Sequence, residues 1–202
     1  MRKWIAIAFA AASLVAGRAS AEDAQRGRAE WYGFPGGGLL FTDASDSTGP
    51  ASFTIGTAFA LRVNGRAAVE VDAVLGLGRR QTIEFGGRTF AAQPMPDTIG
   101  LGASVIVDAV PRSRGVVPYL ASGIGALLVV PRDGTGAVGF TSRSSLPTAN
   151  LGGGLKWYAP GGWGLRADYR VVVVGHDDRT AAFYGDRARV GQRFSIGGFT
   201  VF

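Results

Sequence analysis

Residues 188–202 (ARVGQRFSIGGFTVF) show an alternation of side-chain types that decides the fold. One set of alternate positions is apolar or small apart from Gln192 and Thr200, and comprises Val190, Phe194, Ile196, Gly198 and Phe202. The other set is polar and basic in its first half, and comprises Arg189, Gly191, Arg193, Ser195, Gly197, Phe199 and Val201. A period of two residues predicts a β-strand with two unlike faces. We expect this strand to pair with the first strand of its sheet, which leaves neither edge open.

Seven further runs have the same period, at residues 31–42, 51–63, 66–79, 97–109, 116–130, 145–159 and 162–175. Most reach the roughly 9–11 residues that a tilted membrane strand needs. Their many glycines and β-branched residues disfavour helix. The phase of 31–42 is obscured by Pro35 and its glycines, and the run 116–130 is apolar on both faces. The sequence therefore predicts an all-β protein with eight strands.

The connections between these runs alternate in length. Residues 64–65 (Asn-Gly), 111–115 and 160–161 are short, whereas 43–50, 80–96, 131–144 and 176–187 are longer. Asn-Gly is a strong signal for a two-residue hairpin turn. Short turns on one side and longer loops on the other are typical of antiparallel up-and-down transmembrane barrels, in which the turns are periplasmic.

The charged strand residues gather on the glycine-rich face, opposite the large apolar residues. They are Arg62, Glu70, Asp72, Asp108, Lys156, Arg166, Asp168, Arg170, Arg189 and Arg193. We expect this face to line the interior, with Glu70, Asp72 and Asp168 paired to the basic residues, because buried charges need partners. A soluble barrel of the lipocalin type is the alternative, but it would place its apolar face inside. The distribution therefore favours lipid outside.

Aromatic residues lie near the predicted strand ends. Those near the short-turn side are Trp31, Tyr119, Trp157, Trp163 and Phe202, and those near the long-loop side are Phe41 and Phe53. Two such bands are expected at the interfaces of a membrane barrel.

Residues 1–21 have the three parts of a secretory signal peptide: basic Arg2 and Lys3, an uncharged apolar run, and the small residues at 19–21. Residues 22–30 are predicted to be a polar, solvated periplasmic lead-in, and residues 31–202 the barrel. Removal of 1–21 takes away three basic residues, Arg2, Lys3 and Arg18, and lowers the net charge from +6 to +3. The remaining arginines are scattered, so we predict no nucleic-acid binding. Cysteine is absent, so disulfides do not hold the fold.

Three motifs resemble those of the small eight-stranded outer-membrane barrels, the group that includes the OmpA transmembrane domain and OmpX. Ser195, Gly197 and Phe202 match the C-terminal assembly signal of this group, and Thr200 departs from it. Residues 117–125 (VPYLASGIG) and 150–155 (NLGGGL) resemble strands of these proteins. The resemblance implies location in the outer membrane and recognition by the barrel assembly machinery. It also implies contact with membrane lipid and lipopolysaccharide, and loops that bind host or cell-surface ligands.

Some enzymes share this fold, and the lipid A deacylases place a His and a Ser two residues apart on a late strand. Here the single histidine, His176, precedes Asp177 and Asp178 at a loop edge, and no serine lies two residues away. A nucleophile needs its base within hydrogen-bond reach, so we predict no catalytic residues. We also predict no cofactor or metal site.

The predicted function is a structural or surface-interaction role for a monomeric barrel. Arg79, Arg80 and Arg88 near the second long loop are candidates for binding lipopolysaccharide phosphates. A narrow channel is the first alternative, although about eight strands leave a lumen that side chains can fill. A lipid A-modifying enzyme is the second.

Overall fold

The structure is a computed structural model of the whole chain, and it describes residues 28–42, 48–85, 88–112, 115–138, 141–177, 182–185 and 187–202. The predicted signal peptide, residues 1–21, lies outside the described residues, as does most of the predicted lead-in. The strand β1 begins at Ala29, two residues earlier than predicted. Glu30, which we expected in the solvated lead-in, is therefore part of the barrel and is buried.

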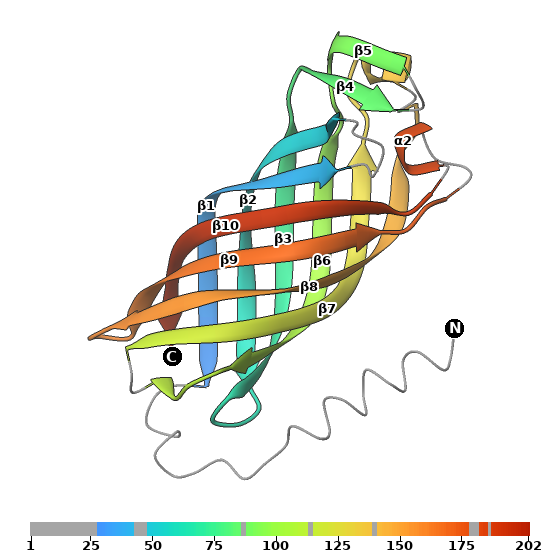
Figure 1. Cartoon of the computed structure of the whole chain (residues 1–202). Coiled ribbons are helices and arrows are strands. Elements are labelled where there is room, and N and C mark those ends of the chain that lie inside the picture. Colours follow the sequence, from blue (N-terminus) through green and yellow to red (C-terminus); the bar gives the residue numbers. More distant parts are fainter. Residues whose placement is uncertain are drawn as a thin grey trace, which may run out of the picture.

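Eight long antiparallel strands close into a barrel (Figure 1), which confirms the predicted fold class. They are β1 (Ala29–Thr42), β2 (Thr48–Arg62), β3 (Ala67–Gly78), β6 (Asp97–Asp108), β7 (Val116–Val130), β8 (Ser144–Ala159), β9 (Trp163–Val174) and β10 (Arg189–Val201). Neighbours along the chain are neighbours in the barrel. The last strand, β10, pairs with β1 from Glu30 opposite Val201 to Thr42 opposite Val190, so the barrel has no open edge.

Three short turns define one end of the barrel, called the turn end below. The β2–β3 turn spans 63–66 and is longer than the two-residue turn predicted from Asn64-Gly65. The Asn64 side chain explains the difference, since its Oδ1 accepts hydrogen bonds from the backbone N–H groups of Arg66 and Ala67, each at 2.8 Å. In the β8–β9 turn, Gly161 and Gly162 adopt positive φ angles of 94° and 78°, which favour glycine.

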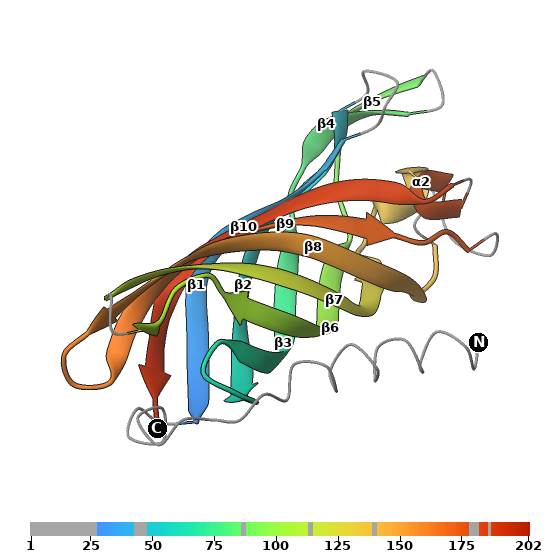
Figure 2. The ribbon, with the colours of Figure 1, turned by 60° about the horizontal axis from the view of Figure 1, so that its bottom comes forward.

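The opposite end, called the loop end, carries additional structure. The connection between β3 and β6 forms a second sheet of two strands, β4 (Gln81–Phe85) and β5 (Arg88–Gln93), which projects beyond the barrel (Figure 2). The sequence predicts only a connection at 80–96, because each of these strands is too short for a clear period. The turn η3 (Thr135–Val138) and the short helix α2 (Ala182–Gly185) lie in the two later loops.

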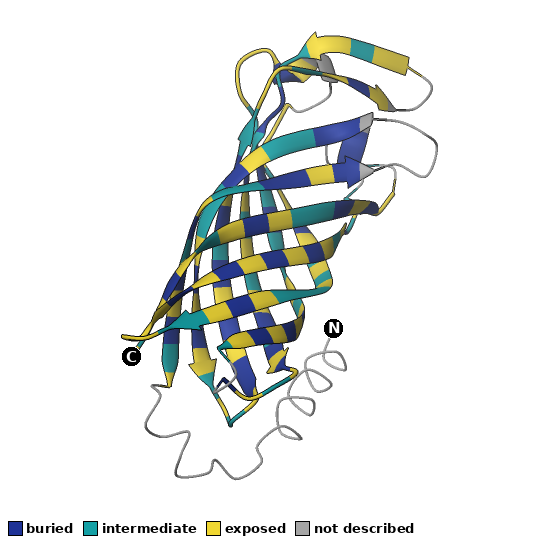
Figure 3. Ribbon diagram, turned by 60° about the vertical axis from the view of Figure 1, so that its left-hand side comes forward, coloured by how far each residue is buried: buried dark blue, intermediate teal, exposed yellow. Residues whose placement is uncertain are grey.

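Burial alternates along the barrel strands, and Figure 3 shows it as bands of buried and exposed residues. Every barrel strand presents large apolar residues on its outer face, with Leu120, Leu151 and Ile196 all more than 60% exposed. The lipocalin-type alternative requires the opposite orientation and is wrong. Of the residues that the structure describes, no helix is long and apolar enough to cross a membrane.

The phase of β1 changes along the strand, which explains why its sequence could not be read. Tyr32 and Phe34 face inward, and so do Leu39 and Phe41, although the two pairs have opposite parity. A β-bulge lies between them: the pairing with β10 passes from Gly33 to Gly36 while β10 retreats by only two residues. One extra residue in a strand reverses the facing of everything after it.

The aromatic prediction is partly wrong. Trp31, Trp157, Trp163 and Phe202 are exposed on the outer wall near the turn end, and Phe53 is exposed on β2 near the loop end. The Trp157 and Trp163 rings meet edge to face, with their centroids 5.6 Å apart. However, Tyr119 and Phe41 are buried in the lumen and cannot belong to an interfacial band. Both lie on the two strands whose phase the sequence left open.

Candidate functional site

The middle of the lumen is occupied by two carboxylates and two guanidinium groups. Arg166, Asp168 and Arg170 alternate along β9 and therefore share its inner face, opposite Glu70 of β3. Glu70 accepts hydrogen bonds from both guanidinium groups, including 3.1 Å from Arg166 Nη2 and 2.7 Å from Arg170 Nη2. Asp168 accepts from Arg166 Nη2 at 2.7 Å and from Arg170 Nε at 2.9 Å. Each charge therefore has two opposite partners.

Tyr119 completes this central cluster, although the sequence predicted it as an interfacial aromatic residue and not as a lumen residue. Its hydroxyl donates to Asp168 Oδ2 at 2.5 Å and accepts from Arg166 Nε at 2.8 Å. The Arg166 guanidinium carbon also lies 4.6 Å from the centroid of the Tyr32 ring and 4.9 Å from that of Tyr119. Because β7 is apolar on both faces, its sequence does not show which face points inward, and the burial of Tyr119 in the structure does.

A second cluster lies nearer the turn end and is built around Glu30. This carboxylate accepts from Lys156 Nζ at 2.8 Å and from the Tyr158 hydroxyl at 3.0 Å, and it pairs with Arg112. Arg62 lies 3.5 Å from Glu30. Of these four partners of Glu30, Arg112 and Tyr158 were not predicted from the sequence as lumen residues.

Asp108 joins this second cluster and was among the predicted lumen charges. It pairs with Arg62, and its Oδ1 lies 3.9 Å from Lys156 Nζ. Lys156 has no exposed surface at all, although it carries an ammonium group. The cluster therefore fills the lumen at the turn end with paired charges.

Three predicted residues, Asp72, Arg189 and Arg193, lie apart from both clusters. Arg193 pairs with Asp72, through Nη1 and Oδ2 at 2.9 Å. Arg189 is buried near the loop end, where its Nε donates to the backbone carbonyl of Phe183 at 2.6 Å. Its guanidinium carbon lies 4.5 Å from the centroid of the Phe183 ring. We expected Arg189 among the lumen charges, and the structure places it instead against helix α2.

The loop end of the lumen is apolar, which corrects the expectation of an interior filled with charges throughout. The buried residues here, called the apolar cap below, are Leu39, Phe41, Ile83, Met95, Leu127, Val129, Leu146, Val174, Phe183 and Tyr184. The Phe41 ring meets the rings of Phe183 and Tyr184 edge to face, at centroid distances of 5.7 and 5.6 Å. Burial raises the pKa of the Tyr184 hydroxyl.

The residues of the C-terminal motif have structural positions in the closing seam. A hydrogen bond of 3.3 Å joins Ser195 to the Tyr32 hydroxyl of β1. Gly197 lies so close to β1 that a Cβ atom there would meet the Gly33 carbonyl oxygen at 2.0 Å. The exposed Phe202 ring lies 6.3 Å from that of Phe59, centroid to centroid. Recognition of these residues by the assembly machinery remains a prediction.

The loop end also holds the residues considered for surface binding and catalysis. Arg79, Arg80 and Arg88 are exposed at the β4–β5 hairpin. His176 is exposed at the edge of the last loop, and Asp178 lies outside the described residues. In the part of the chain that the structure describes, no group of three or more His, Cys, Asp or Glu residues has an arrangement that could hold a metal ion.

An antiparallel eight-stranded barrel with an apolar outer wall and paired charges inside defines the class of small outer-membrane barrels. No protein-family model matches the sequence, and no curated protein matches it. Among solved structures, the chain is similar to Neisserial surface protein A, with a TM-score of 0.60 and 17% identity, over 86% of this chain and 96% of that one. It is also similar to two Pseudomonas aeruginosa proteins, OprG (TM-score 0.49, 11% identity, 86% and 95% covered) and the N-terminal barrel of OprF (0.48, 12%, 86% and 98%). This chain has the fold of the small outer-membrane barrels.

Proposed function

We propose that this protein is a non-enzymatic outer-membrane barrel that acts through its wall and its outer surface. The observation that carries the proposal is that the lumen is filled in two different ways. Paired charges occupy the middle and the turn end, and the apolar cap occupies the loop end. The accessible surface is then the lipid-facing wall and the loop end, where the hairpin β4–β5 projects.

Membrane location follows from the outer wall. Large apolar residues exposed around the barrel would aggregate in water, whereas in lipid they are solvated. The first and last strands of the barrel begin and end at the turn end, where Ala29 pairs with Phe202, so a protein exported by the predicted signal peptide has that end in the periplasm. Single cysteines at Arg88 and Gly136 should then react with an impermeant reagent on intact cells, whereas one at Gly65 should not. Labelling at Gly65 alone would overturn this orientation.

The ligand class we propose for the loop end is the phosphate groups of lipopolysaccharide. Arg79, Arg80 and Arg88 are exposed near one another in sequence, and guanidinium groups bind phosphate oxygens in bidentate geometry. Neighbouring Arg132 is held in place by Asp97, with Nε and Oδ2 2.6 Å apart, and its Nη1 donates to the Gly78 carbonyl at 3.1 Å. This contact anchors the base of the hairpin.

The test compares binding of the purified protein to vesicles with and without lipopolysaccharide. Replacing Arg79, Arg80 and Arg88 together by Gln should weaken binding to the lipopolysaccharide vesicles and reduce its dependence on salt. Arg66→Gln is the matched control, because Arg66 is an exposed arginine at the turn end. Equal binding by the triple variant and the control would refute this ligand class.

The enzyme and channel alternatives predict different outcomes in two experiments, which measure the mass of lipid A and the conductance of a planar bilayer. A lipid A-modifying enzyme would remove an acyl chain in cells that overproduce the protein, and His176→Ala would abolish the effect. The proposal expects lipid A of unchanged mass. A channel would conduct ions across a planar bilayer, whereas a lumen filled by its own side chains should not.

A further inference from the structure

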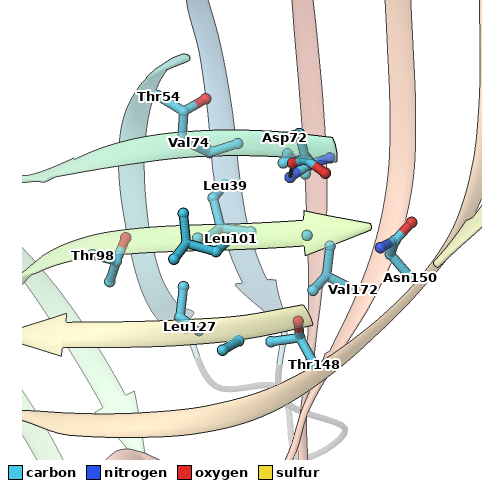
Figure 4. Close-up of a pocket in the computed structure, with 14 residues that line it drawn as sticks. Leu39, Thr54, Asp72, Val74, Thr98, Leu101, Leu127, Thr148, Asn150 and Val172 are labelled. Carbon is cyan, nitrogen blue, oxygen red and sulfur yellow. Dashed lines mark hydrogen bonds and ion pairs between the residues drawn. The ribbon is translucent and has the colours of Figure 1, made fainter. Parts of the chain in front are cut away.

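A small cavity lies within the barrel between the central charge cluster and the apolar cap (Figure 4). Its volume is about 40 Å³. Leu39 and Leu127 of the apolar cap line it on one side. On the other side it is bordered by Asn150, whose Oδ1 lies 3.4 Å from Arg170 Nη1, and by the Asp72–Arg193 pair. The cavity therefore lies where the polar and apolar halves of the lumen meet.

Two buried oxygen atoms at this cavity have no hydrogen-bond partner among the residues that the structure describes. They are Thr54 Oγ1 and Asp72 Oδ1. Thr54 has no exposed surface, and Asp72 is 8% exposed. The other carboxylate oxygen of Asp72 accepts from Arg193, so only half of the carboxylate is satisfied by protein. A buried polar atom that lacks a partner costs the full free energy of removing it from water.

The size and charge of the cavity identify the ligand. A cavity needs roughly 10–15 Å³ to hold one water molecule, so a volume of about 40 Å³ suits about three waters. The negative charge of Asp72 is compensated by Arg193 beside it, which favours a neutral ligand over an ion. The hydroxyl of Thr54 and the carboxylate oxygen of Asp72 together need a molecule that both donates and accepts.

We propose that this cavity is an internal water-binding site, in which about three water molecules bridge Thr54 and Asp72. Thr98, Thr148 and Asn150 also line it and supply the further polar partners that bound water requires. The Asp72–Arg193 pair is then a hydrated ion pair, unlike the pairs of the central cluster, whose charges bind one another directly. The inference concerns the lumen only and does not depend on the proposed surface function.

The test uses the full-length barrel folded in detergent. Thr54→Val keeps the shape of the side chain but removes the hydroxyl. If water bridges Thr54 and Asp72, this variant loses a hydrogen bond and should unfold about 2–4 °C lower, whereas Thr54→Ser should change little. If the cavity is dry, Thr54→Val removes an unsatisfied buried hydroxyl and should unfold at the same or a higher temperature, which would overturn the proposal.

Nuclear Overhauser contacts between water and protein give a second readout that does not depend on stability. Long-lived water should give cross-peaks to the backbone amide of Asp72 and to the methyl group of Thr54, and the Asp72 cross-peak should weaken in Thr54→Val. Absence of both cross-peaks in the unmodified protein would contradict the proposal. A rise in unfolding temperature with sodium, but not with choline at equal ionic strength, would indicate a bound cation and would also overturn it.

Discussion

The two halves of the lumen are filled by opposite chemistry within one barrel. Towards the turn end, Glu30, Glu70 and Asp168 are each held by several basic or hydroxyl groups. Towards the loop end, residues from β1, β4, β7, β8, β9 and helix α2, together with Met95, form the apolar cap. The charged half requires particular partners at fixed distances, whereas the apolar half requires only volume and shape. The comparison indicates that the apolar half should tolerate conservative substitution and that the charged half should not.

The largest expected effect is in the charged half. Asp168→Ala should lower the free energy of unfolding by about 3–5 kcal/mol, because Arg166 and Arg170 lose a shared carboxylate in a buried site. The temperature at which the folded band disappears on a heat-modifiability gel measures this change. Ala167→Ser, the outward-facing neighbour on β9, is the control and should change it little. Equal small effects would mean that the charges of the lumen are solvated.

The next effect tests the apolar half. Leu146 is fully buried in the cap, so Leu146→Ala should cost about 2–5 kcal/mol by removing apolar contacts and leaving a cavity. Leu146→Met keeps the volume and should cost less than about 1.5 kcal/mol. By contrast, Asp168→Asn should remain costly, because it removes the charge that the two arginines share. If Leu146→Met were as damaging as Asp168→Asn, the two halves would not differ in specificity.

The extent to which the sequence predicts this arrangement depends on strand phase. The clean alternation of β9 identifies Arg166, Asp168 and Arg170 as interior residues and opposes them to an apolar outer face. Which carboxylate pairs with which base depends on the stagger of the barrel, and no local pattern contains that information. The pairing of Arg166 and Arg170 with Glu70, about a hundred residues earlier in the chain, is therefore visible only in the structure.

The missed residues have recognisable physical causes. Glu30 has the same parity as the inward Tyr32, so extending the first strand by two residues would have found it. The bulge after Gly33 prevented any such reading of β1. The apolar cap left a signal in β7, since Leu127 and Val129 share the inward parity of Val117 and Tyr119. At its turn end β7 is also apolar on both faces, yet the lumen there is charged, so one strand alone does not determine the chemistry of the lumen.

A third, smaller effect is expected from the hydroxyl group that helps to hold the central cluster in place. Tyr119→Phe removes one hydroxyl that links Arg166 to Asp168 and keeps the ring against the guanidinium group. Hydrogen bonds to charged groups contribute about 1.5–3 kcal/mol, and the loss should fall in that range. Denaturant unfolding of the barrel in detergent measures it. The double variant Tyr119→Phe, Asp168→Ala should cost less than the sum of the two single changes, because both remove the same bond.

The smallest effect concerns the contact that joins the apolar cap to the barrel wall. Arg189 holds helix α2 through a hydrogen bond to the Phe183 carbonyl and through its stacking on the Phe183 ring. Arg189→Lys keeps the positive charge but loses the planar stacking, and should cost about 1 kcal/mol or less. Because α2 belongs to a loop, the loss should appear mainly as faster protease cleavage within 176–188, with the barrel still folded. Arg143→Lys, an exposed arginine in another loop, is the control and should leave cleavage unchanged. Unchanged cleavage in Arg189→Lys would mean that burial of Phe183 and Tyr184 alone keeps the cap in place, so that the apolar half needs no polar anchor at all.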